Sequence, residues 1–181
     1  TMANYLKSGY WEDQGSIERH FNLDSSGLNA KSGLITYSLG NNSFDSNGLI
    51  NGLSELYTES FKLFEETLGI DFQEIIGYSS DATIDIVDSY SGAWAGSYSI
   101  LSGKTGWSLV NVSENWANYY GTGYGTYLIQ TIHHEICHAL GLGHQGDYNG
   151  SASYGIDESF SNDSWQMSIM SYFSQSENIS V

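Results

Sequence analysis

The sequence of 181 residues is poor in cysteine, proline and basic residues, and each shortage restricts what the chain can be. Its single cysteine, Cys137, excludes an intrachain disulfide, and the absence of proline leaves its turns to glycine, asparagine, aspartate and serine. Five lysines and arginines stand against 21 aspartates and glutamates, and the resulting net charge of -16 repels nucleic acid and anionic membranes. No apolar run reaches the roughly 18 residues that a membrane helix needs. We therefore expect neither nucleic acid nor membrane as a partner.

The start of the chain also lacks a basic segment followed by an apolar one, so we expect no classical signal peptide. The length and the 40% content of hydrophobic residues suit one globular domain over residues 1–181. Residues 1–33 look like an extended arm, since they show no clear period. No internal repeat and no linker divides the remainder.

Hydrophobic periodicity predicts two long helices and a series of strands in the remainder of the chain. The helices are expected over 51–68 and 126–140, and Gly69 stands where a left-handed C-cap would end the first. Between them, residues 118–127 form a segment rich in glycine and tyrosine that we predict as a loop. The strands are expected within 34–39, 71–78, 82–90, 93–100 and 107–114. Strands mixed with long helices predict a mixed α/β sheet domain.

Four of the five histidines fall within residues 133–144, which read HHEICHALGLGH. His134 and His138 are four residues apart on a predicted helix, so both imidazoles project from one face. Gly141 can adopt a left-handed conformation that ends the helix and lets His144 return toward the same ion. Three neutral imidazoles with an open fourth position are typical of a catalytic zinc site, whereas structural sites are closed by four protein ligands.

Glu135 follows the first of these ligands and points about 100° away around the helix, which suits a base better than a co-ligand. Zinc lowers the pKa of its bound water to about 7 and polarises a carbonyl group. The Glu135 carboxylate can take the proton of that water and deliver it to the leaving amine. The long motif HExxHxxGxxH in a helical context therefore predicts amide hydrolysis without a covalent intermediate.

These residues resemble the metzincin zinc metallopeptidases, and HALGLGHQGDYNG together with MSYF resembles their serralysin group. The similarity extends from GYWED near the start to MSYFSQSEN near the end. It implies His134, His138 and His144 as zinc ligands and Glu135 as the general base. Met170 in SIMSY would form the hydrophobic floor beneath the metal.

The resemblance also gives Tyr172 a role, as a displaceable fifth ligand that stabilises the tetrahedral intermediate once substrate binds. A phenol can donate the hydrogen bond that this role requires. The family binds an extended peptide antiparallel to an edge strand. By order along the chain, Ala93, Trp94 and Ala95 are the substrate-binding candidates.

The fold that the resemblance implies is a metzincin fold of the α/β (α+β) class. We expect a twisted five-stranded mixed sheet, two long helices, an active-site cleft and an irregular C-terminal lobe. An upper lobe would cover about 1–143, and a lower lobe about 144–181.

Three positions depart from the family pattern or have no role in it. Cys137 stands where the serralysin group usually has glycine, and it suits either a small buried residue or an oxidation-sensitive thiol. Gln145 replaces a common proline after the third ligand, which affects the loop and leaves the zinc ligands unchanged. His133 lies one residue off the ligand face, so a structural role is expected.

The sequence therefore predicts a zinc-dependent endopeptidase with one catalytic zinc ion and protein or peptide substrates. Two alternatives stay open: a catalytically silent zinc-site module for binding or adhesion, and a metal hydrolase with a non-peptide substrate. An intact Glu135 argues against the first, since a binding module needs no base. We expect a monomer that is secreted in the bacterial manner. Because no GGxGxD repeat occurs, we predict no calcium from such repeats.

Overall fold

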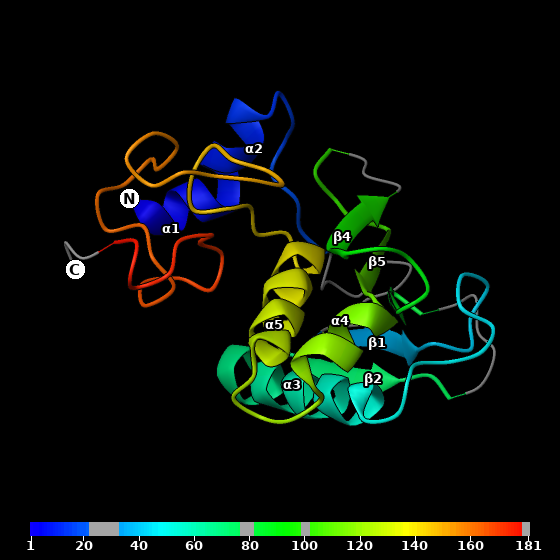
Figure 1. Cartoon of the computed structure of the whole chain (residues 1–181). Helices are drawn as coiled ribbons and strands as arrows, with labels where there is room; N and C mark the ends of the chain where they lie inside the picture. Colours follow the sequence, from blue (N-terminus) through cyan, green and yellow to red (C-terminus); the bar gives the residue numbers. More distant parts are fainter. Residues whose placement is uncertain (22–32, 77–81, 99–101, 179–181) are drawn as a thin grey trace. The chain divides into compact units, whose positions relative to one another are not determined.

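The computed structural model describes residues 1–21, 33–76, 82–98 and 102–178 (Figure 1). The chain forms two compact units. One consists of Thr1–His20 together with Leu140–Val181, and the other of Phe21–Ala139. The predicted lobes of a single domain stay a prediction. Within the described residues, no helix is both long and apolar enough to cross a membrane.

A five-stranded sheet is the centre of the second unit, as far as its residues are described (Figure 1). The strands are β1 (Leu34–Leu39), β2 (Asp71–Glu74), β3 (Ile84–Val87), β4 (Ala93–Tyr98) and β5 (Trp107–Val112). Their order is β2-β1-β3-β5-β4. All neighbours are parallel except β4, which runs antiparallel to β5. The predicted mixed sheet is confirmed, and the predicted strand ends at residues 77–78 and 99–100 lie outside the described residues.

Two long helices of the second unit cover this sheet, as predicted. They are α3 (Leu53–Leu68) and α5 (Tyr127–Ala139). Helix α3 ends at Gly69, whose left-handed conformation lets its N–H reach the Glu65 carbonyl. Helix α5 packs on β4 and β5, α3 packs on β2, and the two helices contact each other. Their apolar faces and the buried strand β3 form the core of this unit.

A third helix, α4 (Glu114–Tyr120), was not predicted. Its first turn is capped by the Ser113 side chain, which accepts a hydrogen bond from the Trp116 N–H. The helix spans only seven residues, and its aromatic and asparagine residues have modest helix propensity. The periodicity of so short a segment is not visible in the sequence, and part of it fell in the predicted 118–127 loop.

The first unit contains an N-terminal helical segment in place of the predicted extended arm. It consists of α1 (Met2–Asn4), a π-helical segment (Tyr5–Gly9) and α2 (Tyr10–Asp13). Gly15 follows this segment with a positive φ of 64°. Residues 140–178 form turns and loops with one isolated pair of bridged residues, Asn149 and Ser151. The expected irregular C-terminal region is therefore present.

A buried carboxylate on strand β3 fixes the middle of the sheet. The Asp85 side chain is 3% exposed and accepts hydrogen bonds from the Ser38 hydroxyl and the Trp107 indole N–H. Burial raises the pKa of Asp85, and both hydrogen bonds act in the opposite direction. The carboxylate therefore depends on these two donors for its charged form.

Replacing Trp107 with phenylalanine is expected to lower the free energy of unfolding by about 1–3 kcal/mol near neutral pH, because a buried charged group loses a donor. A folded-state pKa above the unfolded value means that stability falls as pH rises past the unfolded value of about 4. The loss should therefore be smaller near pH 4. Urea denaturation at both pH values measures it. In an Asp85→Asn background, a loss that still varied with pH would contradict this explanation.

Candidate metal centre

The predicted zinc ligands lie in the C-terminal half of α5 and in the loop that follows it. His134 and His138 are one turn apart and partly buried, with their rings edge to face at 4.6 Å between centroids. Gly141, with a φ of 109°, turns the chain after the helix. His144 follows and is 3% exposed. The sequence thus predicted both the helix that carries two imidazoles and the turn before the third.

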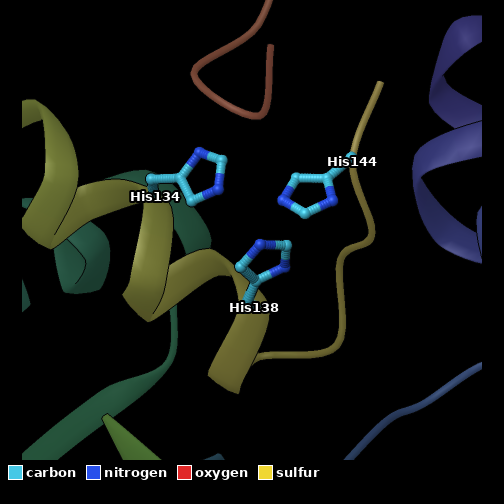
Figure 2. Close-up of side chains that lie close together, drawn as sticks. All are labelled: His134, His138 and His144. Carbon is cyan, nitrogen blue, oxygen red and sulfur yellow. The ribbon is translucent and has the colours of Figure 1, made fainter. Parts of the chain in front are cut away.

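The three imidazoles offer one nitrogen each, and these atoms lie within 4.8 Å of one another (Figure 2). Three nitrogens bound tetrahedrally to one zinc ion at 2.0–2.1 Å would be separated by roughly 3.4 Å. The separation in the structure is therefore close enough for small ring rotations to complete the site. The donor set of three neutral nitrogens without a thiolate fits a catalytic ion with an open position.

Glu135 lies on the same helix, and its side chain is 6% exposed. Its Oε2 atom is buried and has no hydrogen-bond partner among the described residues. Burial raises the pKa of this carboxyl to about 8. A buried carboxylate oxygen without a protein donor is rare, and a water or a cation nearby would satisfy it. Glu135 adjoins His134 in sequence, and a buried carboxylate oxygen without a protein donor is chemically able to act as a base on a water molecule.

Met170 and Tyr172 lie in the first unit, together with His144. Met170 is fully buried, and its carbonyl accepts a hydrogen bond of 3.2 Å from the N–H of Gln145, the residue after the third imidazole. The Tyr172 ring lies edge to face with the His144 ring at 4.6 Å between centroids. The Tyr172 hydroxyl accepts a hydrogen bond from the Gly150 N–H. Both residues thus lie against the segment that carries His144.

The substrate-binding candidates Ala93, Trp94 and Ala95 open strand β4. This strand pairs with β5 on one side and ends the order of the described sheet. Helix α5, which carries His134 and His138, packs against β4. The edge strand and two of the imidazoles therefore belong to directly packed elements.

The structure explains in part the three positions that depart from the family pattern or have no role in it. Cys137 is 8% exposed, and burial raises the pKa of its thiol to about 12. Both observations favour a small buried residue over a reactive thiol. The His133 ring lies 3.1 Å from the Ser60 hydroxyl and edge to face with Phe64. Since that hydroxyl donates to the Leu56 carbonyl, the His133 ring must be the donor. The buried Gln145 side chain has no hydrogen-bond partner among the described residues.

The sequence did not indicate Tyr10, which the structure brings to the site. Its hydroxyl lies 3.3 Å from His144 Nδ1, and its side chain is 4% exposed. Tyr10 is one of fourteen tyrosines and stands in a segment without visible periodicity. The only signal available was the family resemblance of GYWED.

Comparison with known proteins agrees with this geometry. The family Peptidase M10, described as matrixin, matches residues 29–154. The match covers well over half of the chain, including the sheet, the long helices and all three imidazoles. The chain belongs to the matrixin family. This confirms the resemblance to metzincin zinc metallopeptidases. Zinc is the metal that membership of this family implies for the three imidazoles.

Individual relatives match shorter segments. Serralysin C of Dickeya chrysanthemi is 47% identical over 66 residues, which are 35% of this chain and 14% of that protein. Metalloprotease AprA of Pseudomonas entomophila (strain L48) is 44% identical over 73 residues, which are 39% of this chain and 14% of that protein. The chain thus matches about one seventh of the length of each relative. The serralysin-like character of this matrixin-family chain is confirmed over these segments.

Among solved structures, the GM1-bound form of the ECX AB5 holotoxin is similar in 77% of this chain and 64% of its own. The sequence identity is 17% and the TM-score is 0.41, and these values are too low to establish a shared fold or function.

Proposed function

We propose that this chain is a zinc endopeptidase that hydrolyses extended proteins or peptides. The observation that supports this most strongly is the approach of three imidazole nitrogens to within 4.8 Å of one another. The helix that carries two of them also carries Glu135, whose buried Oε2 atom has no hydrogen-bond partner among the described residues. A binding module would need the imidazoles alone. Membership of a peptidase family and similarity to a protein named as a metalloprotease support the same reaction class.

His134, His138 and His144 would hold the ion. When bound, zinc supplies a Lewis acid that polarises a substrate carbonyl and acidifies a water molecule. Helix α5 fixes two of the ligands by its own geometry, because residues four apart project from one face. The third ligand depends on the loop after Gly141, whose positive φ only glycine adopts without strain.

Glu135 would act as the general base and then as the general acid. Its carboxylate would accept a proton from the attacking water and transfer it to the leaving amine. The burial that raises the pKa of Glu135 favours the protonated form that the second step needs. A cation held by the adjacent imidazoles would favour the ionised form that the first step needs. The two influences suit a group that takes and then returns one proton.

Tyr172 would donate a hydrogen bond to the oxyanion that develops on the substrate carbonyl. Its ring lies against the His144 ring, and its hydroxyl is held by the Gly150 N–H. That hydrogen bond, at 3.3 Å, is long for the type, so it offers little resistance to a change of partner. Such a change of partner is what a displaceable ligand would require. Met170, which is fully buried, would keep the floor of the site apolar.

The substrate would bind as an added strand along β4. An edge strand presents unpaired backbone groups, and a peptide that pairs with them gains affinity from main-chain hydrogen bonds. Ala93, Trp94 and Ala95 would contact it. This mode gives modest side-chain selectivity, which suits a protease with varied protein substrates. We also propose that the chain acts outside the cell as a monomer, as the serralysin resemblance implies.

Removal of zinc is expected to abolish hydrolysis of casein, since no protein group replaces the Lewis acid. The test measures casein hydrolysis before and after treatment with a zinc chelator, and metal content on the same samples. Stoichiometric zinc, loss of activity with the chelator and recovery on addition of zinc are the expected results. Bound zinc without hydrolysis of casein or peptides would contradict the proposal and favour the binding module.

A further inference from the structure

The N-terminal arm, defined as residues 1–20, lies against the ligand loop, defined as residues 140–145, within the same compact unit. The Gly143 N–H donates a hydrogen bond of 2.7 Å to the Leu6 carbonyl. The Trp11 indole N–H donates one of 2.9 Å to the Gly141 carbonyl, and this bond is buried. Two backbone groups of the loop therefore take their partners from a segment about 130 residues away in sequence.

The arm also approaches the loop so closely that the loop has no room for a side chain at Gly141 or Gly143. A Cβ atom added at Gly143 would lie 2.2 Å from the Tyr10 ring, and one added at Gly141 would lie 2.3 Å from the Arg19 carbonyl oxygen. Real Cβ atoms essentially never show contacts below 3.0 Å. Both glycines are therefore needed for contact with the arm. Gly143, which has no positive φ, is needed for this reason alone.

Tyr10 connects the arm to the third imidazole. Its hydroxyl lies 3.3 Å from His144 Nδ1, and its ring meets the His144 ring edge to face at 5.2 Å. Figure 2 shows one ring nitrogen of His144 directed toward His134 and His138, and the other directed away from them. The nitrogen that faces Tyr10 is thus not the one that faces the other ligands.

This geometry determines the tautomer that His144 needs. A neutral imidazole carries its proton on one nitrogen, and the nitrogen that binds a metal must be free of it. If Nδ1 donates its hydrogen to the Tyr10 oxygen, Nε2 keeps its lone pair for the ion. A second hydrogen bond of this kind orients the ring and raises the basicity of the ligating nitrogen. His134 and His138 lie on helix α5, whereas His144 lies in the loop after the helix, and Tyr10 contacts its ring there.

We infer that Tyr10 is a positioning residue that holds His144 in its metal-binding tautomer and orientation, and that the arm is part of the zinc site. The inference rests on the proposed zinc site, and it does not require that the site be an active peptidase. It predicts that the affinity for zinc depends on a hydroxyl near the start of the chain.

The test compares the zinc affinity of the whole chain with that of its Tyr10→Phe variant, by competition with a chromophoric chelator. Phenylalanine keeps the ring contact and removes only the hydroxyl. We expect zinc affinity to fall about 10- to 100-fold, as for other groups that support a metal ligand. The matched control is Tyr5→Phe, which removes a hydroxyl bonded to Asp13 in the same arm and should leave the affinity unchanged.

A second measurement separates positioning from a general loss of structure. In NMR spectra of the zinc-loaded chain, the Nδ1 proton of His144 should be protected from exchange with solvent, and Tyr10→Phe should remove that protection. The melting temperature of the metal-free variant should stay close to that of the unaltered chain. Equal zinc affinities of the unaltered chain and Tyr10→Phe would overturn the inference. Zinc binding without peptide hydrolysis would overturn the proposed function alone, and a chain that binds no zinc would overturn both.

Discussion

Replacing Glu135 with glutamine is expected to lower peptide hydrolysis by about 10²- to 10⁴-fold, the usual contribution of a general base. Glutamine keeps the shape of the side chain and cannot accept the proton. The bound zinc should remain at one ion per chain, because the three imidazoles are unchanged. The fold should tolerate the change, since burial already disfavours the charge on Glu135. Hydrolysis of casein and metal content, measured on the same preparation, test both parts.

The matched control for this variant is Glu66→Gln, which removes an exposed carboxylate from helix α3 and should leave hydrolysis unchanged. Comparing the two separates the loss of the base from a change in overall charge. Full hydrolysis by the Glu135→Gln variant would exclude Glu135 as the base. Loss of zinc in that variant would instead mean that the carboxylate belongs to the metal site.

The strongest predictions from sequence concerned elements whose periodicity repeats over several turns or alternations. Helix α3 and helix α5 lie within two residues of their predicted bounds, and β1 agrees at both ends. Each of these elements has an apolar face that packs in the core. The spacing of the apolar residues that form such a face is a local pattern, so it is visible in the sequence. The spacing of His134 and His138 was predictable for the same reason, since it depends only on helical geometry.

The N-terminal arm could not be predicted in this way. Its helical turns are short, they include a π-helical segment, and they are stabilised by partners about 130 residues later. The Trp11 side chain pairs with a loop carbonyl, and Arg19 stacks over the Trp11 ring at 3.9 Å. Interactions between distant segments leave no periodic trace in either one. For the same reason, the contact between Tyr10 and His144 was visible only in three dimensions.

The motif itself carried more structural information than its ligands alone indicate. From sequence, Gly141 was expected because the chain must turn, and its φ of 109° agrees. The structure adds a steric reason, because the Arg19 carbonyl occupies the space that a side chain would need. The signature thus records a contact with the arm as well as a turn.

Replacing Gly141 with alanine is therefore expected to be among the most damaging single changes in the chain. The positive φ alone costs about 1–3 kcal/mol for a residue with a side chain. The new Cβ would also lie 2.3 Å from the Arg19 carbonyl oxygen, and because that oxygen belongs to the backbone, a side-chain rotation cannot relieve the contact. The arm or the ligand loop must move, and either movement displaces His144. We expect a lower melting temperature and zinc affinity reduced at least 10-fold.

Gly155→Ala provides the control that separates these two causes. Gly155 has a φ of 90° in the same unit, and nothing lies within 4 Å of the Cβ that alanine would add. This variant should suffer backbone strain alone, with a modest fall in melting temperature and unchanged zinc affinity. Circular dichroism and chelator competition on both variants measure the difference. If Gly141→Ala were no worse than Gly155→Ala in either property, the close approach of the arm would have no energetic weight, and Gly141 would be required by the turn alone.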